Sequence, residues 1–77
     1  MPTAFVLLST QTGVESDVLD DIGRIKNVDE AFAVYGAYDI VAKIKTETMY
    51  ELKETVLQCI RKRDSIQSTL TMLVVEE

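Results

Sequence analysis

The chain has 77 residues, of which 47% are hydrophobic and 27% charged, so we predict one folded domain spanning residues 1–77 with one modest core. A net charge of −5, with 13 acidic against 8 basic residues, argues against direct binding to nucleic acid, because DNA-binding domains carry a basic face that neutralises phosphates. The single cysteine is typical of a reducing compartment, and the chain shows neither a signal peptide nor an apolar run of membrane-spanning length, which predicts a cytoplasmic protein.

The first half of the chain predicts a strand followed by a helix. Ala4 to Ser9 is an apolar run too short for a helix, which favours a strand. Thr12-Gly13-Val14-Glu15 has the spacing of a capping box, so we expect a helix to start there, to contain Gly23, and to close at Lys26-Asn27. Apolar residues along it recur at intervals of four, four and three and form one stripe, Val14, Val18, Ile22 and Ile25.

A hairpin is predicted next. Residues 28–35 alternate loosely between two faces, and residues 40–45 alternate again after a short turn. Within the turn, Gly36 can adopt the positive φ that tight turns often require, and Asp39 can accept hydrogen bonds from nearby backbone amides.

A second helix and a last strand complete the pattern. Thr48-Met49-Tyr50-Glu51 repeats the capping-box spacing and predicts the start of the helix. Its apolar stripe is Met49, Leu52, Val56 and Ile60, with Leu57 alongside. Cys59 is expected to be a buried small hydrophobe, and Arg61-Lys62-Arg63 is interpreted as a helix end that favours cations rather than as a nucleic-acid patch. Residues 65–75 predict a long strand with Thr69 and Thr71 on the same face.

The order β-α-β-β-α-β predicts an α+β, ferredoxin-like fold: a four-stranded antiparallel sheet with both helices on one face. The other face of such a sheet stays uncovered. The alternation assigns to it Ala33, Tyr35, Val41, Leu73 and Val75. An exposed apolar patch marks an association site, so we expect the chain to dimerise sheet to sheet.

The turn also predicts a ligand. Tyr35 and Tyr38 flank Gly36, so backbone amides, the Asp39 carboxylate and a phenol hydroxyl gather at one edge of the sheet. Such groups suit a small zwitterion such as an amino acid. Ordinary structural roles remain open beside this one: the glycine and aspartate can simply make the turn, and the tyrosines can be interface aromatics.

The order and spacing of these motifs resemble the effector-binding (RAM) domain of the leucine-responsive and AsnC-type (Lrp/AsnC) transcription regulators. The resemblance covers nearly the whole chain. It rests on Val28 after the first helix, on Gly36, Tyr38 and Asp39 in the Gly-x-Tyr-Asp turn, and on Thr-x-Thr at residues 69–71 followed by apolar residues. Full regulators of this family carry an N-terminal helix-turn-helix, which nothing here matches, so the chain is similar to a stand-alone version of the domain.

The resemblance implies a dimeric α/β barrel whose dimers assemble into rings, commonly octamers, with an amino acid held between neighbouring dimers. Gly36, Ala37 and Tyr38 would offer backbone groups to the ligand carboxylate, and Asp39 would accept from its ammonium. Hydroxyls of Thr69 and Thr71 would complete a ligand-binding set of Tyr35, Gly36, Ala37, Tyr38, Asp39, Thr69 and Thr71. The two threonines are also good strand formers, so a purely structural role stays open for them.

The leading functional hypothesis is therefore an amino-acid sensor without cofactor or metal, which modulates transcription or amino-acid metabolism by mixing into assemblies of full-length regulators. One alternative is a small ferredoxin-like enzyme of the monooxygenase or isomerase type. The chain has no histidine, no cluster with metal-ligand spacing and no phosphate-binding glycine loop, so we assign no catalytic residue. A structural adaptor for assembly is the other alternative.

Overall fold

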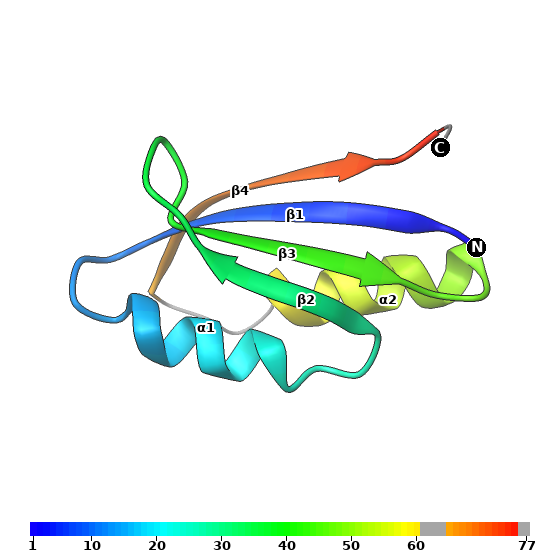
Figure 1. Ribbon diagram of the computed structural model, residues 1–77, viewed down its shortest axis with the longest axis horizontal. Helices are drawn as coiled ribbons and strands as arrows, with labels where there is room; N and C mark the ends of the chain where they lie inside the picture. Colours follow the sequence, from blue (N-terminus) through cyan, green and yellow to red (C-terminus); the bar gives the residue numbers. More distant parts are fainter. Residues whose placement is uncertain (61–64, 76–77) are drawn as a thin grey trace.

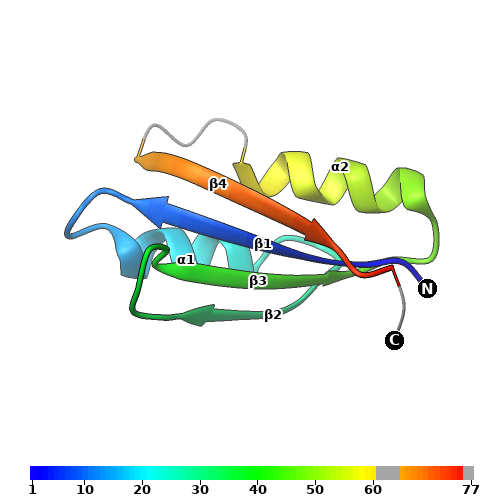
Figure 2. The ribbon, with the colours of Figure 1, turned by 90° about the horizontal axis from the view of Figure 1, so that it is seen from above.

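The computed structural model describes residues 1–60 and 65–75. Its elements in chain order are β1 (Thr3–Thr10), α1 (Glu15–Gly23), β2 (Val28–Ala33), β3 (Ile40–Lys45), α2 (Met49–Ile60) and β4 (Ile66–Leu73). The strands form one four-stranded antiparallel sheet in the order β2-β3-β1-β4, and both helices lie on one side of it (Figures 1 and 2). The predicted ferredoxin-like α+β fold is confirmed.

The core lies between the sheet and the two helices. Side chains alternate along a strand, so every second residue of the two central strands faces the helices. These residues are fully buried: Ala4, Val6 and Leu8 of β1, and Ile40, Ala42 and Ile44 of β3. Val18 and Ile22 of α1 and Leu52 and Cys59 of α2 close the cluster from the other side, which confirms that the cysteine is buried.

The start of α1 differs from the capping-box prediction. The helix begins at Glu15, and Val14 precedes it without any side-chain cap. Thr12 is exposed, and the Glu15 carboxylate instead accepts a hydrogen bond from the Gly13 amide at 2.6 Å. Thr12 and Glu15 do have the spacing of a capping box, but the chain makes a turn before the helix begins. The Glu15 carboxylate therefore bonds the amide two residues back rather than three.

The end of α1 is also earlier than predicted. Gly23 is its last residue rather than an interior one. The amides of Arg24 and Ile25 donate to carbonyls three residues back, which is the tighter bonding typical of a helix terminus. Asn27 then has a φ of 78°, a left-handed conformation in which asparagine is enriched.

The start of α2 confirms its predicted cap. The Thr48 hydroxyl accepts a hydrogen bond from the Glu51 amide at 3.1 Å and donates to the Glu51 carboxylate at 3.3 Å. We expect Thr48→Ala to lower the free energy of unfolding by about 1 kcal/mol, because one amide of the first turn loses its acceptor. Thr12→Ala is the matched control and should leave stability unchanged in urea unfolding, since Thr12 makes no cap. Equal losses in both variants would contradict this assignment.

The buried face of α2 agrees in part with the predicted stripe: Leu52 is buried, and Val56 and Ile60 pack against the core while partly exposed. Leu52, Thr55 and Cys59 are its buried residues, whereas Met49 and Leu57 are 46% and 41% exposed. Burial of Thr55 is possible because its hydroxyl donates to the Glu51 carbonyl at 2.8 Å and accepts from the Asn27 amide group at 3.3 Å. The predicted basic helix end at residues 61–63 lies outside the described residues.

The uncovered face of the sheet is not the one that the sequence assigned. Leu73 pairs with Ala4 and Ala33 pairs with Ile40, and both partners are fully buried, so these two residues face the helices. Tyr35 and Val75 lie beyond the ends of their strands. By register, the apolar residues of the uncovered face are Phe5, Leu7, Phe32, Val41, Leu70 and Met72. Only Val41 of the predicted set belongs there.

Candidate functional site

The hairpin loop between β2 and β3 stands out from the fold. Figures 1 and 2 show this loop (green) at the end of the hairpin, rising from the side of the sheet opposite the helices. Tyr35, Gly36 and Ala37 are exposed and Tyr38 is half-buried. Among the described residues, no protein group accepts a hydrogen bond from the backbone amides of residues 35–38. The loop therefore presents amides that a carboxylate can use.

Asp39 fixes the base of this loop. Its amide donates to the Leu8 carbonyl at 2.8 Å, and its carbonyl accepts from the Val34 amide at 2.8 Å. Its side-chain Oδ2 accepts from the backbone amide of Thr10 at 2.9 Å. The carboxylate thus ties the hairpin to the end of β1, and its second oxygen is the group left to accept from a ligand. The structural role predicted as an alternative is present in the molecule.

Gly36 has a φ of 143°, in the region that favours glycine, and a Cβ there would meet no atom within 4 Å. We expect Gly36→Ala to lower the free energy of unfolding by about 1–2 kcal/mol through backbone strain alone. Gly23→Ala is the matched control: its Cβ would also meet open space, and alanine at a helix end is neutral or stabilising by up to about 1 kcal/mol. Thermal unfolding of both variants separates the two effects, and equal shifts would contradict the strain assignment.

A hollow of about 290 Å³ lies against this loop. It is lined by Glu15, Ala33, Val34, Tyr35 and Asp39. Glu15, at the first turn of α1, is the residue that sequence reasoning missed, because its capping-box position gave it a complete structural explanation. The structure places Glu15 at the same hollow as Asp39 and Tyr35.

The two threonines lie elsewhere in the protomer. Thr69 pairs with Leu8 and Thr71 with Val6, so the two share a face as predicted, but that face is the helix side of the sheet and not the bare side to which the sequence assigned it. Strand β4 is separated from β3 by β1, and neither threonine lines the hollow beside the loop. Thr71 lines a separate groove between β4 and α2. One protomer therefore brings Tyr35 and Asp39 together but does not bring them to the threonines.

Groups that favour opposite charges lie around the loop. Two carboxylates at the hollow favour a positively charged group, and the exposed amides of the loop favour a negatively charged one. Within residues 1–60 and 65–75, no group of three or more histidine, cysteine, aspartate or glutamate residues is placed to hold a metal ion. No helix in this part of the chain is long and apolar enough to cross a membrane.

The fold and the hollow together define a small ligand-binding domain built on a ferredoxin-like sheet. The chain belongs to the family described as the Lrp/AsnC ligand binding domain, whose family model matches residues 3–77. Its curated relatives include the HTH-type transcriptional regulator FL11 of Pyrococcus horikoshii, which is 30% identical over 73 residues. That match covers 95% of this chain and 48% of the regulator, so the chain spans about half the length of the curated relatives it matches.

Solved structures share the whole fold. The hypothetical protein PHS023 from Pyrococcus horikoshii superimposes with a TM-score of 0.87 at 39% identity, and the match covers 100% of this chain and 93% of that one. The transcriptional regulator NMB0573 from Neisseria meningitidis, solved as an L-Met complex, gives a TM-score of 0.79 at 19% identity over 99% of this chain and 51% of that one. At that identity the second likeness shows the fold alone.

Proposed function

We propose that this chain is an amino-acid-binding and oligomerisation domain that modulates transcription regulation without catalysis and without binding DNA itself. The observation that carries the proposal is the hollow beside Tyr35 and Asp39, next to a loop with exposed amides, in a domain of the Lrp/AsnC ligand-binding family. The curated relatives are transcription regulators, which supports a regulatory role.

The proposed ligand is held at both of its charged ends. Its ammonium donates to the free oxygen of Asp39, with Glu15 lining the same hollow, and its carboxylate accepts from the amides of Gly36, Ala37 and Tyr38. Charge-assisted hydrogen bonds at opposite ends fix the orientation of a zwitterion and reject molecules that carry only one of the two charges. Tyr35 lines the same hollow and is fully exposed in one protomer, so its ring is available to a ligand.

The assembly we propose is a homodimer formed by stacking the uncovered sheet faces, with dimers joining into a higher oligomer such as an octamer. Apolar residues from all four strands support the first step, because they form one patch on the uncovered face. Thr69 and Thr71 lie away from the loop of their own protomer, so in this assembly they would reach a ligand only from a neighbouring copy. Mixed assembly with full-length regulators in the cytoplasm would deliver the regulatory effect.

Isothermal titration of the folded protein against the twenty amino acids tests the proposal. At least one amino acid should give saturable heat. Circular dichroism on the same sample shows that the protein is folded, so the absence of saturable heat for every amino acid would remove the sensing function.

A structural adaptor is the second candidate, and one observation favours it. The Asp39 carboxylate already has a structural partner in the Thr10 amide, so its presence in the turn has an explanation without any ligand. An adaptor would assemble in the same way and bind no amino acid. Light scattering after size-exclusion chromatography, with and without amino acids, follows both properties in one measurement.

A further inference from the structure

Thr10, the last residue of β1, breaks the pattern of its strand. Every second residue of β1 faces the helices, and the first three of this series are fully buried apolar residues, Ala4, Val6 and Leu8. Thr10 continues the series and pairs with Ile66, which packs against the core. Only 6% of Thr10 is exposed, so the position suits an apolar side chain such as valine, yet the sequence places a hydroxyl there.

The hydroxyl of Thr10 has no hydrogen-bond partner. Among residues 1–60 and 65–75, its Oγ1 is the one buried side-chain nitrogen or oxygen that forms no hydrogen bond. A buried polar group without a partner is destabilising, because it has lost its hydrogen bonds to water and gained none in return. Such groups are rare in folded proteins, and they are often found where a side chain has a function in another state of the molecule.

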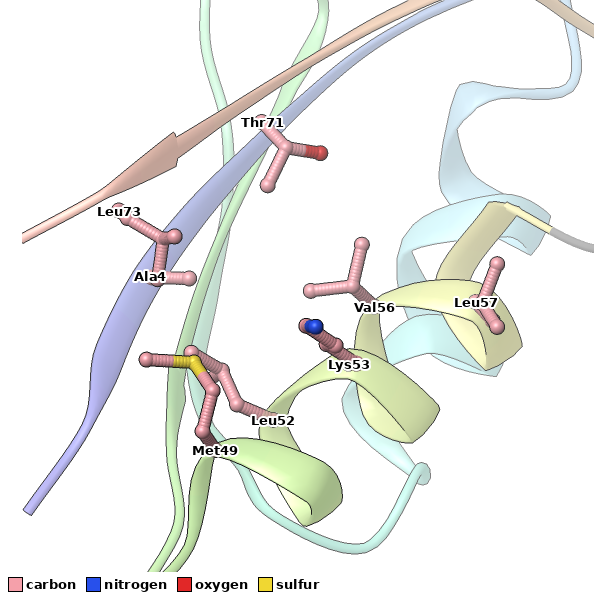
Figure 3. Close-up of a pocket in the computed structure, with 8 residues that line it drawn as sticks. All are labelled: Ala4, Met49, Leu52, Lys53, Val56, Leu57, Thr71 and Leu73. Carbon is pink, nitrogen blue, oxygen red and sulfur yellow. The ribbon is translucent and has the colours of Figure 1, made fainter.

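Two other threonines of the helix layer show how such a hydroxyl is usually satisfied. Thr55 of α2 is 3% exposed, but its hydroxyl donates to the Glu51 carbonyl at 2.8 Å and accepts from the Asn27 amide group at 3.3 Å. Thr71 of β4 is exposed beside the groove between α2 and β4, so it is open to water (Figure 3). Thr10 has neither a protein partner nor access to solvent.

The backbone of Thr10 already contacts the candidate site. Its amide donates to Oδ2 of Asp39 at 2.9 Å, and Asp39 lines the hollow beside the hairpin loop. A threonine hydroxyl is three bonds from its own amide nitrogen, so the two lie about 3–4 Å apart in every rotamer. Thr10 therefore places two donors near one carboxylate, and only the amide is in use.

We infer that Thr10 is a positioning residue of the proposed amino-acid site, and that its hydroxyl donates to the Asp39 carboxylate when an amino acid is bound. In the free protomer Asp39 is half-buried, so its carboxylate is still partly open to water. An amino acid in the hollow displaces that water, and an ionised carboxylate out of water is stable only with additional donors. The ligand ammonium supplies one donor, and the Thr10 hydroxyl supplies another after a change of side-chain rotamer.

This inference rests on the proposed amino-acid function and adds to it a residue that does not line the hollow. Thr10 acts through Asp39 and does not touch the ligand. Its hydroxyl destabilises the free protomer, where it is unpaired, and stabilises the bound one, where it gains a charged acceptor. Removing the hydroxyl should therefore change stability and amino-acid affinity in opposite directions.

Isothermal titration of the intact chain with the twenty amino acids tests the effect on affinity. Thr10→Val removes the hydroxyl and keeps the shape of the side chain, so the amino acid that binds the wild type most strongly should bind this variant about 10-fold more weakly. Thr10→Ser keeps the hydroxyl and should bind within about 3-fold of the wild type. Equal affinities of the wild type and Thr10→Val, or equal losses in the two variants, overturn the inference.

Thermal unfolding without amino acid, at one protein concentration, tests the effect on stability. Thr10→Val should raise the Tm by about 4–8 °C, because an unpaired buried group is removed. Thr55→Val is the matched control, since its hydroxyl is equally buried but satisfied: it should lower the Tm by a similar amount and leave amino-acid affinity unchanged. A Tm that falls in Thr10→Val as it does in Thr55→Val means that the hydroxyl is already paired in the free protein, and the inference fails.

Failure of this inference and failure of the proposed function give different results. If the folded wild type binds none of the twenty amino acids, the sensing function is refuted and the role of Thr10 falls with it. If the wild type binds an amino acid and Thr10→Val binds it equally well, only the role of Thr10 is refuted, and the ligand contact proposed for Asp39 stands.

Discussion

Asp39→Asn is expected to leave the fold intact and to weaken amino-acid binding by about 10- to 100-fold. Asparagine keeps a carbonyl oxygen that can accept from the Thr10 amide, so the tie between the hairpin and β1 survives. It removes the negative charge that a ligand ammonium needs, and a hydrogen bond to a charged group is worth about 1.5–3 kcal/mol. Isothermal titration with the amino acid that binds the wild type most strongly gives the affinity directly.

Asp39→Ala separates the two roles of this side chain. It removes the acceptor as well as the charge, so we expect the same loss of affinity together with a fall of about 1–3 kcal/mol in the free energy of unfolding. Urea unfolding of both variants provides the comparison. An unchanged amino-acid affinity in Asp39→Asn would assign this carboxylate to the turn alone and favour the structural adaptor.

Leu70→Lys is expected to convert the proposed dimer into monomers. Leu70 lies on the uncovered face, where it pairs with Leu7 next to Val41, and 44% of it is exposed in one protomer. A twofold interface carries the change twice, and an unpaired charge in an apolar interface is strongly unfavourable, so the dimer dissociation constant should rise by at least about 100-fold. Light scattering coupled to size-exclusion chromatography over a dilution series measures it.

Leu57→Lys is the control for this prediction. Leu57 has a nearly equal exposed fraction, 41%, but it lies on α2 on the opposite side of the sheet. It should therefore leave the dimer intact. If the two lysine variants dissociate to the same extent, or if Leu70→Lys remains dimeric, the uncovered sheet face is not the dimer interface.

The fold was predictable because its signals are local. The apolar run of β1, the alternation in β3 and the Thr48–Glu51 cap each depend on residues close in sequence, and the structure confirms all three. The cap predicted at Thr12 failed because hydrogen bonds of the preceding turn compete with it, as the Gly13–Glu15 contact shows. Spacing alone does not distinguish a cap that forms from one that does not.

The assignment of sheet faces failed for a physical reason. A strand pattern shows that two sets of residues face opposite ways, but it does not say which set meets the helices. Register decides that, and the bulge between Val28 and Glu30 shifts the alternation of β2 relative to its partner. Leu73 and Ala33 face the helix layer because they pair with the buried Ala4 and Ile40, although the sequence placed them on the bare side.

The candidate site was predicted in part. Tyr35 and Asp39 meet at one hollow because they belong to the same turn, which the sequence identified. Glu15 joins them from α1, and no local signal links residues that far apart along the chain. Thr71 lies away from this hollow, because the strand order places β1 between β4 and the hairpin. It lines a groove between α2 and β4 instead.

The sequence by itself determined the order of the elements, the hairpin turn and the family resemblance, since periodicity, capping and turn chemistry act between neighbouring residues. Only the tertiary structure decided which sheet face is bare, which residues share a hollow, and that α2 leaves a groove beside β4. These features depend on strand order, register and the position of a helix over the sheet. They arise from contacts between distant segments, which no local pattern encodes.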